Sequence, residues 1–163
     1  MIVSFDLDDT LFVNPQVCDT EPLLRFPLQF LYRERLRKGT VSLLSEMQAQ
    51  GIFVWIYTTS YRSPAYIRLL FRAYGIRIDG IVNGERHHRE VQGEKAEAMP
   101  SKYPSRYRIA LHVDDDVSVV QNGGIYGFRV CSIQQNEENW EAKIWREIEQ
   151  IRQQIEGGKK NGK

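Results

Sequence analysis

Short apolar runs alternate with amphipathic stretches along the chain. Five runs rich in β-branched and aromatic residues have the length and composition of strands. The predicted strands are Ile2–Phe5, Ile52–Tyr57, Ile78–Val82, Ile109–Val113 and Phe128–Ile133. Runs this short and this apolar are typical of strands buried inside a sheet.

Three further stretches have the apolar spacing of helices. Residues 41–51 carry apolar side chains three residues apart and close with a glycine. In residues 63–75, Ser63 and Pro64 are typical of a helix N-cap and first helical position, and a glycine again ends the pattern. Residues 139–155 form one apolar stripe with charges elsewhere, which predicts a helix that docks on the core.

Strands that alternate with helices predict an α/β protein. Such βα units give a parallel sheet with helices on both faces, so we expect a three-layer, Rossmann-like fold around a central, mostly parallel five-stranded sheet. The pattern shows no repeat and no second domain. We therefore expect residues 1–156 to form a single domain and residues 157–163, which hold only Gly, Lys and Asn, to be a disordered tail.

The composition is that of an ordinary globular protein. Lys and Arg number 22 against 21 Asp and Glu, so net charge does not indicate nucleic acid or an anionic membrane as partner, although a nucleic-acid substrate stays possible. Cys18 and Cys131 lie far apart and predict neither a disulfide framework nor a zinc site. With no leader or membrane span in the pattern, we expect a cytoplasmic protein, and a monomer as the default oligomeric state.

Polar residues gather where three of the predicted strands end. Asp6, Asp8 and Asp9 follow the first strand, residues 58–62 (TTSYR) follow the second, and residues 114–116 (DDD) follow the fourth. Two like charges 4 Å apart cost about 4 kcal/mol at an effective dielectric of 20, so carboxylates that converge here need a cation among them. An all-oxygen ligand set favours Mg²⁺, and no His or Cys is placed for zinc.

The spacing of Asp6 and Asp8 also suits phosphoryl chemistry. Two carboxylates two residues apart at the end of a strand can reach the same space, so that one attacks as a nucleophile while the other handles protons. A phosphoryl group also needs Mg²⁺, a lysine to offset its charge and a hydroxyl to hold its oxygens. Thr58 and a lysine from residues 95–102 can supply the last two.

Taken together, these segments resemble the haloacid dehalogenase-like (HAD) phosphohydrolases, in a small-cap or capless branch. The sequences FDLDDT, WIYTTS and SKYPSRYRIALHVDD follow the order of the family's motifs across most of the chain. The resemblance implies that Asp6 becomes an aspartyl-phosphate and that Asp8 is the general acid and base, whose backbone carbonyl also meets Mg²⁺. It implies that Thr58 binds phosphoryl oxygens and that a lysine stabilises the transition state. The implied metal site consists of Asp6, Asp8, Asp114 and Asp115.

Two parts of this pattern leave alternatives. Lys102 stands only twelve residues before Asp114, too close for a helix of normal length, whereas Lys95 lies in a short helix-like patch. We favour Lys102, because KYP shortly before HVDD resembles the small-cap branch, and keep Lys95 as the alternative. Among the acids, the resemblance ranks Asp115 first as metal ligand and Asp114 as an outer or partner ligand. Asp116 is expected to cap the next helix.

Other polar residues are assigned by position. Thr59 and Arg62 follow Thr58 and are candidates for contact with the substrate, with a solvated arginine as the alternative for Arg62. His87 and its neighbour His88 lie in the basic sequence RHHR, which is typical of a surface loop. His112 falls inside the fourth strand, where we expect a buried imidazole with satisfied hydrogen bonds.

The chain leaves little room for a cap domain. The spans from Thr10 to Thr58 and from Val82 to Lys102 are too short for one, so we expect an open site. Open sites of this superfamily tend to act on large substrates, which favours a Mg²⁺-dependent phosphatase for phosphorylated proteins or nucleic-acid ends, with small phosphate esters as an open alternative. One alternative is a phospho-acceptor signalling domain, although its acceptor Asp would end the third strand, where this chain has Asn83. The other is a catalytically silent binding module.

Overall fold

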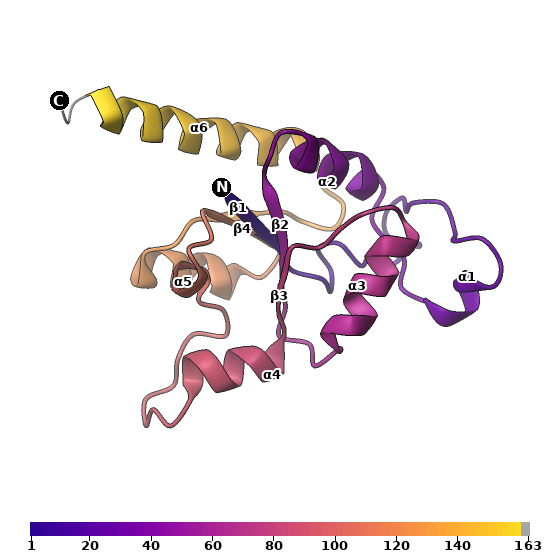
Figure 1. Ribbon diagram of the computed structural model, residues 1–163, viewed down its shortest axis with the longest axis horizontal. Coiled ribbons are helices and arrows are strands. Elements are labelled where there is room, and N and C mark those ends of the chain that lie inside the picture. Colours follow the sequence, from indigo (N-terminus) through magenta and orange to yellow (C-terminus); the bar gives the residue numbers. More distant parts are fainter. Residues whose placement is uncertain (161–163) are drawn as a thin grey trace.

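The structure, a computed structural model, describes residues 1–160 and is built on one sheet (Figure 1). Its strands are β1 (Ile2–Phe5), β2 (Phe53–Tyr57), β3 (Gly80–Val82), β4 (Leu111–Asp114) and β5 (Val130–Ser132). They lie in the order β3-β2-β1-β4-β5, and every neighbouring pair is parallel. In the central strand, Val3 is in register with Val54 on one side and Leu111 on the other. The predicted five-stranded α/β fold is confirmed.

Helices of very different length connect and follow the strands. They are α1 (Leu28–Leu31), α2 (Thr40–Ala49), α3 (Pro64–Ala73), α4 (Gly84–His87), α5 (Val117–Tyr126) and α6 (Trp140–Lys160), together with the π turn η1 (His88–Gln92) and the 3₁₀ turn η2 (Pro104–Tyr107). The predicted start of α3 is confirmed, since the Ser63 side chain accepts a hydrogen bond from the Tyr66 amide and Pro64 opens the helix.

The last helix is longer than its apolar stripe predicts. It includes residues 157–160, which the sequence places in a disordered tail, so helical structure continues beyond the last apolar position, Ile155. The other three residues of that expected tail, 161–163, lie outside the described residues.

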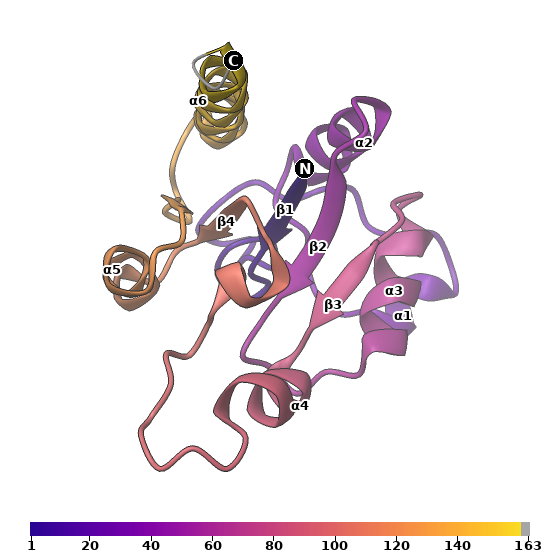
Figure 2. The ribbon, with the colours of Figure 1, turned by 60° about the vertical axis from the view of Figure 1, so that its left-hand side comes forward.

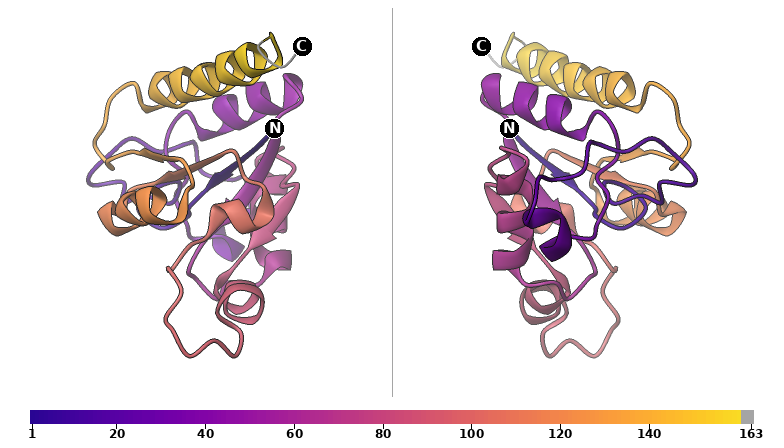
Figure 3. Two further views of the ribbon diagram at one scale, coloured as in Figure 1. Left: turned by 90° about the vertical axis from the view of Figure 1, so that its left-hand side faces the viewer. Right: turned by 90° about the vertical axis from the view of Figure 1, so that its right-hand side faces the viewer.

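The two faces of the sheet differ in character. Neighbouring residues of a strand point to opposite faces. One face carries Val3 and Phe5 and packs against apolar side chains of α2, α3 and α6, which form the main core. The other face carries Ser4, Tyr57 and His112 and is covered by η2 and the segment before it, with α5 beside β5. Figure 2 shows α3 and α5 on opposite sides of the sheet, and Figure 3 shows α2 and α6 together on one side.

No part of the described chain forms a separate cap. The long connection from β1 to α2 carries α1, and the connection from β3 to β4 carries α4, η1 and η2. These elements are too short to enclose a site of their own, so the carboxyl ends of the strands remain open. Within residues 1–160, no helix combines the length and the apolar composition needed to cross a membrane.

Candidate active site

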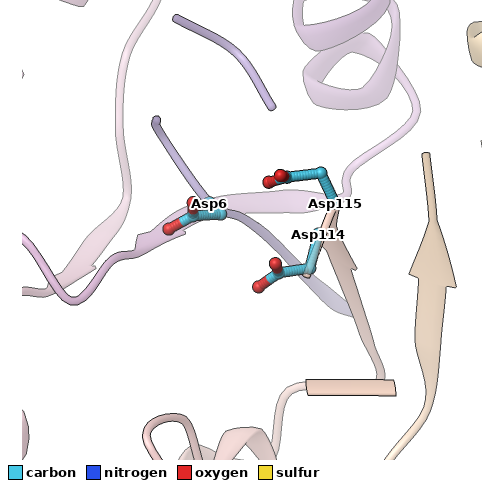
Figure 4. A group of neighbouring side chains, drawn as sticks. All are labelled: Asp6, Asp114 and Asp115. Atoms are coloured by element: carbon cyan, nitrogen blue, oxygen red, sulfur yellow. The ribbon is translucent and has the colours of Figure 1, made fainter. Parts of the chain in front are cut away.

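Three carboxylates meet at the carboxyl ends of β1 and β4. Asp6 directly follows β1, Asp114 is the last residue of β4, and Asp115 follows it. One oxygen from each lies within 4.8 Å of the others, and Figure 4 shows the three side chains facing a common space. Because β1 and β4 are neighbours, the parallel topology itself brings these distant residues together.

Lys102 enters this cluster from the segment that precedes η2. Its Nζ lies 2.8 Å from Oδ1 of Asp6 and 2.6 Å from Oδ2 of Asp114, and its side chain is 4% exposed. Lys95 instead donates a hydrogen bond to the carbonyl of Val91, at 2.9 Å. Between Lys102 and Asp114 the chain forms only the 3₁₀ turn η2, because these twelve residues are too few for a helix of normal length. The structure thus brings Lys102, and not Lys95, to the carboxylates.

A buried histidine extends the cluster beneath the edge of the sheet. Nε2 of His112 lies 2.8 Å from Oδ2 of Asp114, and Nδ1 lies 2.8 Å from Oγ of Ser4. An ionised carboxylate can only accept, so Nε2 donates and Nδ1 accepts the hydrogen of Ser4. Burial lowers the pKa of His112, in agreement with a neutral ring. The expected buried, satisfied imidazole is confirmed.

The contact between His112 and Asp114 was not foreseen from the sequence, although a signal for it exists. Residues two apart in a strand lie on the same face. A polar residue two positions before a strand-terminal acid is therefore placed to contact that acid, as His112 does.

The three acids differ in how well their charge is compensated. Burial raises the pKa of Asp6 to about 6, although the charge of Lys102 opposes the shift. Burial alone would raise the pKa of Asp114, but the hydrogen bond from His112 and the charge of Lys102 lower it to about 2. Burial also raises the pKa of Asp115, whose Oδ1 accepts a hydrogen bond from Thr10 at 2.8 Å.

The cluster has the donor chemistry of a site for a hard divalent cation. Oδ1 of Asp6 is buried and lies 2.8 Å from Nζ of Lys102, the one ion-pair partner that Asp6 has among the described residues. Asp114, by contrast, accepts from Lys102, from His112 and from the Asp116 amide. A carboxylate with a single ion-pair partner keeps acceptor sites for a cation, and oxygen ligands suit Mg²⁺. Asp6 and Asp115 are therefore the freer ligands of the set.

Asp8 lies apart from the three clustered acids and pairs with Arg62. Its two oxygens accept hydrogen bonds from the guanidinium at 2.8 and 2.9 Å, and its side chain is 51% exposed. The guanidinium also lies 3.4 Å from Glu34 and over the ring of Phe12. The hydrogen bonds that Arg62 donates to Asp8 raise the pKa of Arg62. Arg62 is thus fixed beside the candidate acid and base, rather than extended into solvent.

The loop after β2 carries the candidate hydroxyl. Thr58 is 1% exposed, and its Oγ1 accepts a hydrogen bond from the Ser60 amide at 3.1 Å, which leaves its own hydrogen available. Thr59 is exposed at the same edge. A Cβ on Gly84 would lie 2.4 Å from the Thr59 carbonyl, so the loop packs directly on the start of α4 and requires glycine there. This close packing holds the loop against the sheet.

Two acids in these turns have structural roles. Asp9 adopts the left-handed backbone conformation, with φ of 61°, which Asp tolerates better than most residues. Asp116 is the N-cap of α5 and accepts a hydrogen bond from the Ser118 amide at 2.7 Å, as predicted.

The sequence misplaces His87. The RHHR segment predicts a surface loop, but His87 ends α4, is half-buried and lies 2.6 Å through Nδ1 from Oη of Tyr57. The sequence gives no signal for this contact, because it depends on where α4 packs.

Comparison with solved structures identifies the architecture. A structure described as a predicted HAD-like family hydrolase from Porphyromonas gingivalis superposes with a TM-score of 0.51 at 12% identity, covering 89% of this chain and 96% of that one. The fold is that of the HAD-like hydrolases. Within this HAD-like fold, the acidic cluster lies at the carboxyl ends of the parallel strands, where such sheets bind ligands.

Two D,D-heptose 1,7-bisphosphate phosphatases superpose less well. The one from Burkholderia thailandensis has a TM-score of 0.45 at 19% identity and covers 78% of this chain and 74% of that one. The one from B. bronchiseptica, complexed with magnesium and phosphate, has a TM-score of 0.46 at 12% identity and covers 90% and 98%. By sequence alone, no family model and no curated protein matches the chain.

Proposed function

We propose that the protein is a Mg²⁺-dependent phosphohydrolase that works through an aspartyl-phosphate on Asp6. The observation that carries this proposal is the buried cluster in which Lys102 bridges Asp6 and Asp114, with Asp115 beside them. A nucleophilic carboxylate, a fixed ammonium and further acids for a cation are the groups that phosphoryl transfer requires. The HAD-like fold is in keeping with the same chemistry.

Asp6 is the proposed nucleophile. A carboxylate oxygen of Asp6 forms a bond to phosphorus while the bond from phosphorus to the leaving oxygen breaks. The burial that raises its pKa to about 6 leaves the carboxylate ionised above that pH but poorly solvated, which favours attack. Water then attacks the phosphorus of the aspartyl-phosphate, inorganic phosphate leaves, and the carboxylate is restored.

Asp8 is the proposed general acid and base. It gives a proton to the leaving oxygen in the first step and takes one from the attacking water in the second. Both of its oxygens accept hydrogen bonds from Arg62 in the structure, so Arg62 has to release one of them. An incoming phosphoryl group offers the guanidinium another anion, which supports the assignment of Arg62 as a substrate contact.

Three further groups complete the proposed machinery. The free hydrogen of the Thr58 hydroxyl is available to a phosphoryl oxygen, and exposed Thr59 lies next to it. Lys102 keeps a positive charge where negative charge increases during transfer. Asp6 and Asp115 would hold Mg²⁺ together with the backbone carbonyl of Asp8, with Asp114 as their partner. Bound Mg²⁺ supplies neutralisation of the charge on the phosphoryl oxygens.

The proposed substrate is large, such as a phosphorylated protein or a nucleic-acid end. This is supported by the absence of a separate cap in residues 1–160 and by the exposure of Asp8 and Thr59 at the edge of the sheet. A site without a lid admits a phosphate carried on a bulky molecule.

Hydrolysis of p-nitrophenyl phosphate with and without Mg²⁺, in wild type and in Asp6→Asn, tests the proposal. We expect Mg²⁺-dependent release of phosphate that Asp6→Asn abolishes. Equal, negligible rates for both proteins across metals and pH would instead indicate a silent binding module. A stable phosphoryl group on wild type after incubation with acetyl phosphate, without turnover, would indicate a phospho-acceptor domain, although Asn83 at the end of β3 caps α4 and offers no acceptor carboxylate.

A further inference from the structure

Lys102 needs support from outside its own segment. It lies in residues 93–103, which form neither helix nor strand between η1 and η2. A lysine with a flexible four-carbon stem on such a segment is not positioned by local secondary structure. Its ammonium is nevertheless buried between Asp6 and Asp114, so contacts from elsewhere must fix the segment.

The hydroxyl of Tyr57 makes the first of these contacts. Tyr57 ends β2, its side chain is fully buried, and its Oη accepts a hydrogen bond from the amide of Tyr103 at 2.8 Å. The same Oη lies 2.6 Å from Nδ1 of His87. An amide N–H only donates, so the hydrogen of Tyr57 is free to reach Nδ1. The residue directly after Lys102 is thereby attached to the end of β2.

His87 completes the support from α4. Burial lowers the pKa of His87, although the carbonyl of Pro100 faces the ring and opposes the shift. A neutral ring keeps Nδ1 as the acceptor that Tyr57 requires. The segment is therefore attached through Tyr103, the residue directly after Lys102, and the Pro100 carbonyl that opposes the shift belongs to the same segment.

The Tyr57 ring also lies beneath the other partners of the lysine. Its centroid is 5.7 Å from that of His112, whose imidazole bonds Asp114, and 5.7 Å from that of Tyr107 in η2. One buried ring thus contacts both the turn that follows Lys102 and the histidine that orients its carboxylate partner. A shift of this ring would move both sides of the ion pair.

We propose that Tyr57 and His87 form a clamp that positions Lys102 for phosphoryl transfer. The inference rests on the proposed function, in which Lys102 stabilises the transition state. Both members are positioning residues, because they act through the backbone of residues 100–103. Loss of the Tyr57 hydroxyl would leave the Tyr103 amide and Nδ1 of His87 without partners and would release the lysine's segment.

The test is Tyr57→Phe in the full chain, which keeps the ring and removes the hydroxyl. Its matched control is Tyr107→Phe, which removes from the same aromatic cluster a buried hydroxyl that has no hydrogen-bond partner among the described residues. With Mg²⁺ and p-nitrophenyl phosphate, we expect kcat of Tyr57→Phe to fall about 10- to 100-fold with little change in KM. In the metal-free protein, the ¹⁵N signal of the Lys102 ammonium should broaden through exchange with water. Tyr107→Phe should match wild type in both measurements.

His87→Leu provides a second variant, which removes the acceptor of the Tyr57 hydrogen together with the rest of the imidazole ring, and we expect the same two changes. If Tyr57→Phe folds and keeps both the wild-type kcat and the wild-type ammonium signal, the clamp is overturned, even if thermal stability drops. If Tyr57→Phe does not fold, the same measurements on His87→Leu decide. If the ammonium signal changes in the variants while wild type hydrolyses nothing, the clamp stands and the proposed function fails.

Discussion

In the absence of metal, the charge of Asp6 should destabilise the fold. The carboxylate is buried, its contact with Lys102 only partly offsets the cost of burial, and Asp114 lies close by. Asp6→Asn keeps the shape and removes the charge. We therefore predict that this variant is more stable than wild type at pH 7.5 in EDTA, although the variant also loses the attraction between Asp6 and Lys102.

The size and pH dependence of this effect follow from the raised pKa. Burial raises the pKa of Asp6 from 3.8 to about 6, which corresponds to about 3 kcal/mol. The folded state holds this proton more tightly than the unfolded state does, so the contribution of Asp6 to stability falls as pH rises from about 4 to 6. Above pH 6 the buried charge destabilises the fold in full, and below about pH 4 this destabilisation vanishes. The difference in free energy of unfolding between Asp6→Asn and wild type should change with pH in the same way.

Urea unfolding followed by tryptophan fluorescence at pH 4 and at pH 7.5 measures the difference. Asp19→Asn is the control, because that carboxylate is exposed and pairs with Lys38 at the surface, where such pairs contribute little. Mg²⁺ at 100 times its dissociation constant should stabilise wild type by about 2.7 kcal/mol and so narrow the difference. Two results would refute the reasoning. One is a free energy of unfolding of Asp6→Asn that does not exceed that of wild type in EDTA at pH 7.5. The other is a difference between the two proteins that is the same at pH 4 and pH 7.5.

Two other substitutions test separate parts of the structure. Lys102→Met should lower kcat for p-nitrophenyl phosphate about 10²- to 10³-fold, because a fixed positive group is lost from the transition state, whereas Lys95→Met should leave it unchanged. Comparable losses of kcat in Lys102→Met and Lys95→Met would contradict the placement of Lys102. The second substitution tests stability. Asp116→Ala should lower the free energy of unfolding by about 1 kcal/mol through loss of the α5 N-cap, whereas Asp116→Asn should stay close to wild type in urea unfolding. Equal effects of Ala and Asn would exclude capping as the cause.

Much of the fold is predictable because its signals are local. Each strand is a short apolar run, and the cap of α3 is readable from Ser63 and Pro64 alone. That Asp6 and Asp114 lie at the same edge also follows from the sequence, once a parallel sheet is assumed, but their proximity requires that β1 and β4 be neighbours, which the structure shows. The end of α6 is predicted less accurately, because the helix continues past the last residue of its apolar stripe, where the sequence no longer carries a helical pattern.

The contacts around Lys102 could not be predicted in the same way. The choice between Lys102 and Lys95 depends on η2, a single turn whose position no periodicity marks. The pairing of Asp8 with Arg62 depends on the path of the loop after β2, and the pairing of His87 with Tyr57 depends on the packing of α4. These are tertiary contacts between segments with no shared pattern, so neither propensity nor spacing encodes them.

The position of β1 in the middle of the sheet has a consequence for synthesis on the ribosome. Its partner β2 is complete at Tyr57, but its other partner, β4, is complete only at Asp114. At about 5 to 20 residues per second, this interval lasts roughly 3 to 11 s. During that time the nascent chain exposes one open edge of β1, and Asp6 has neither Lys102 nor β4 beside it. One edge of β1 therefore stays available for unwanted strand pairing while residues 58–114 are being made.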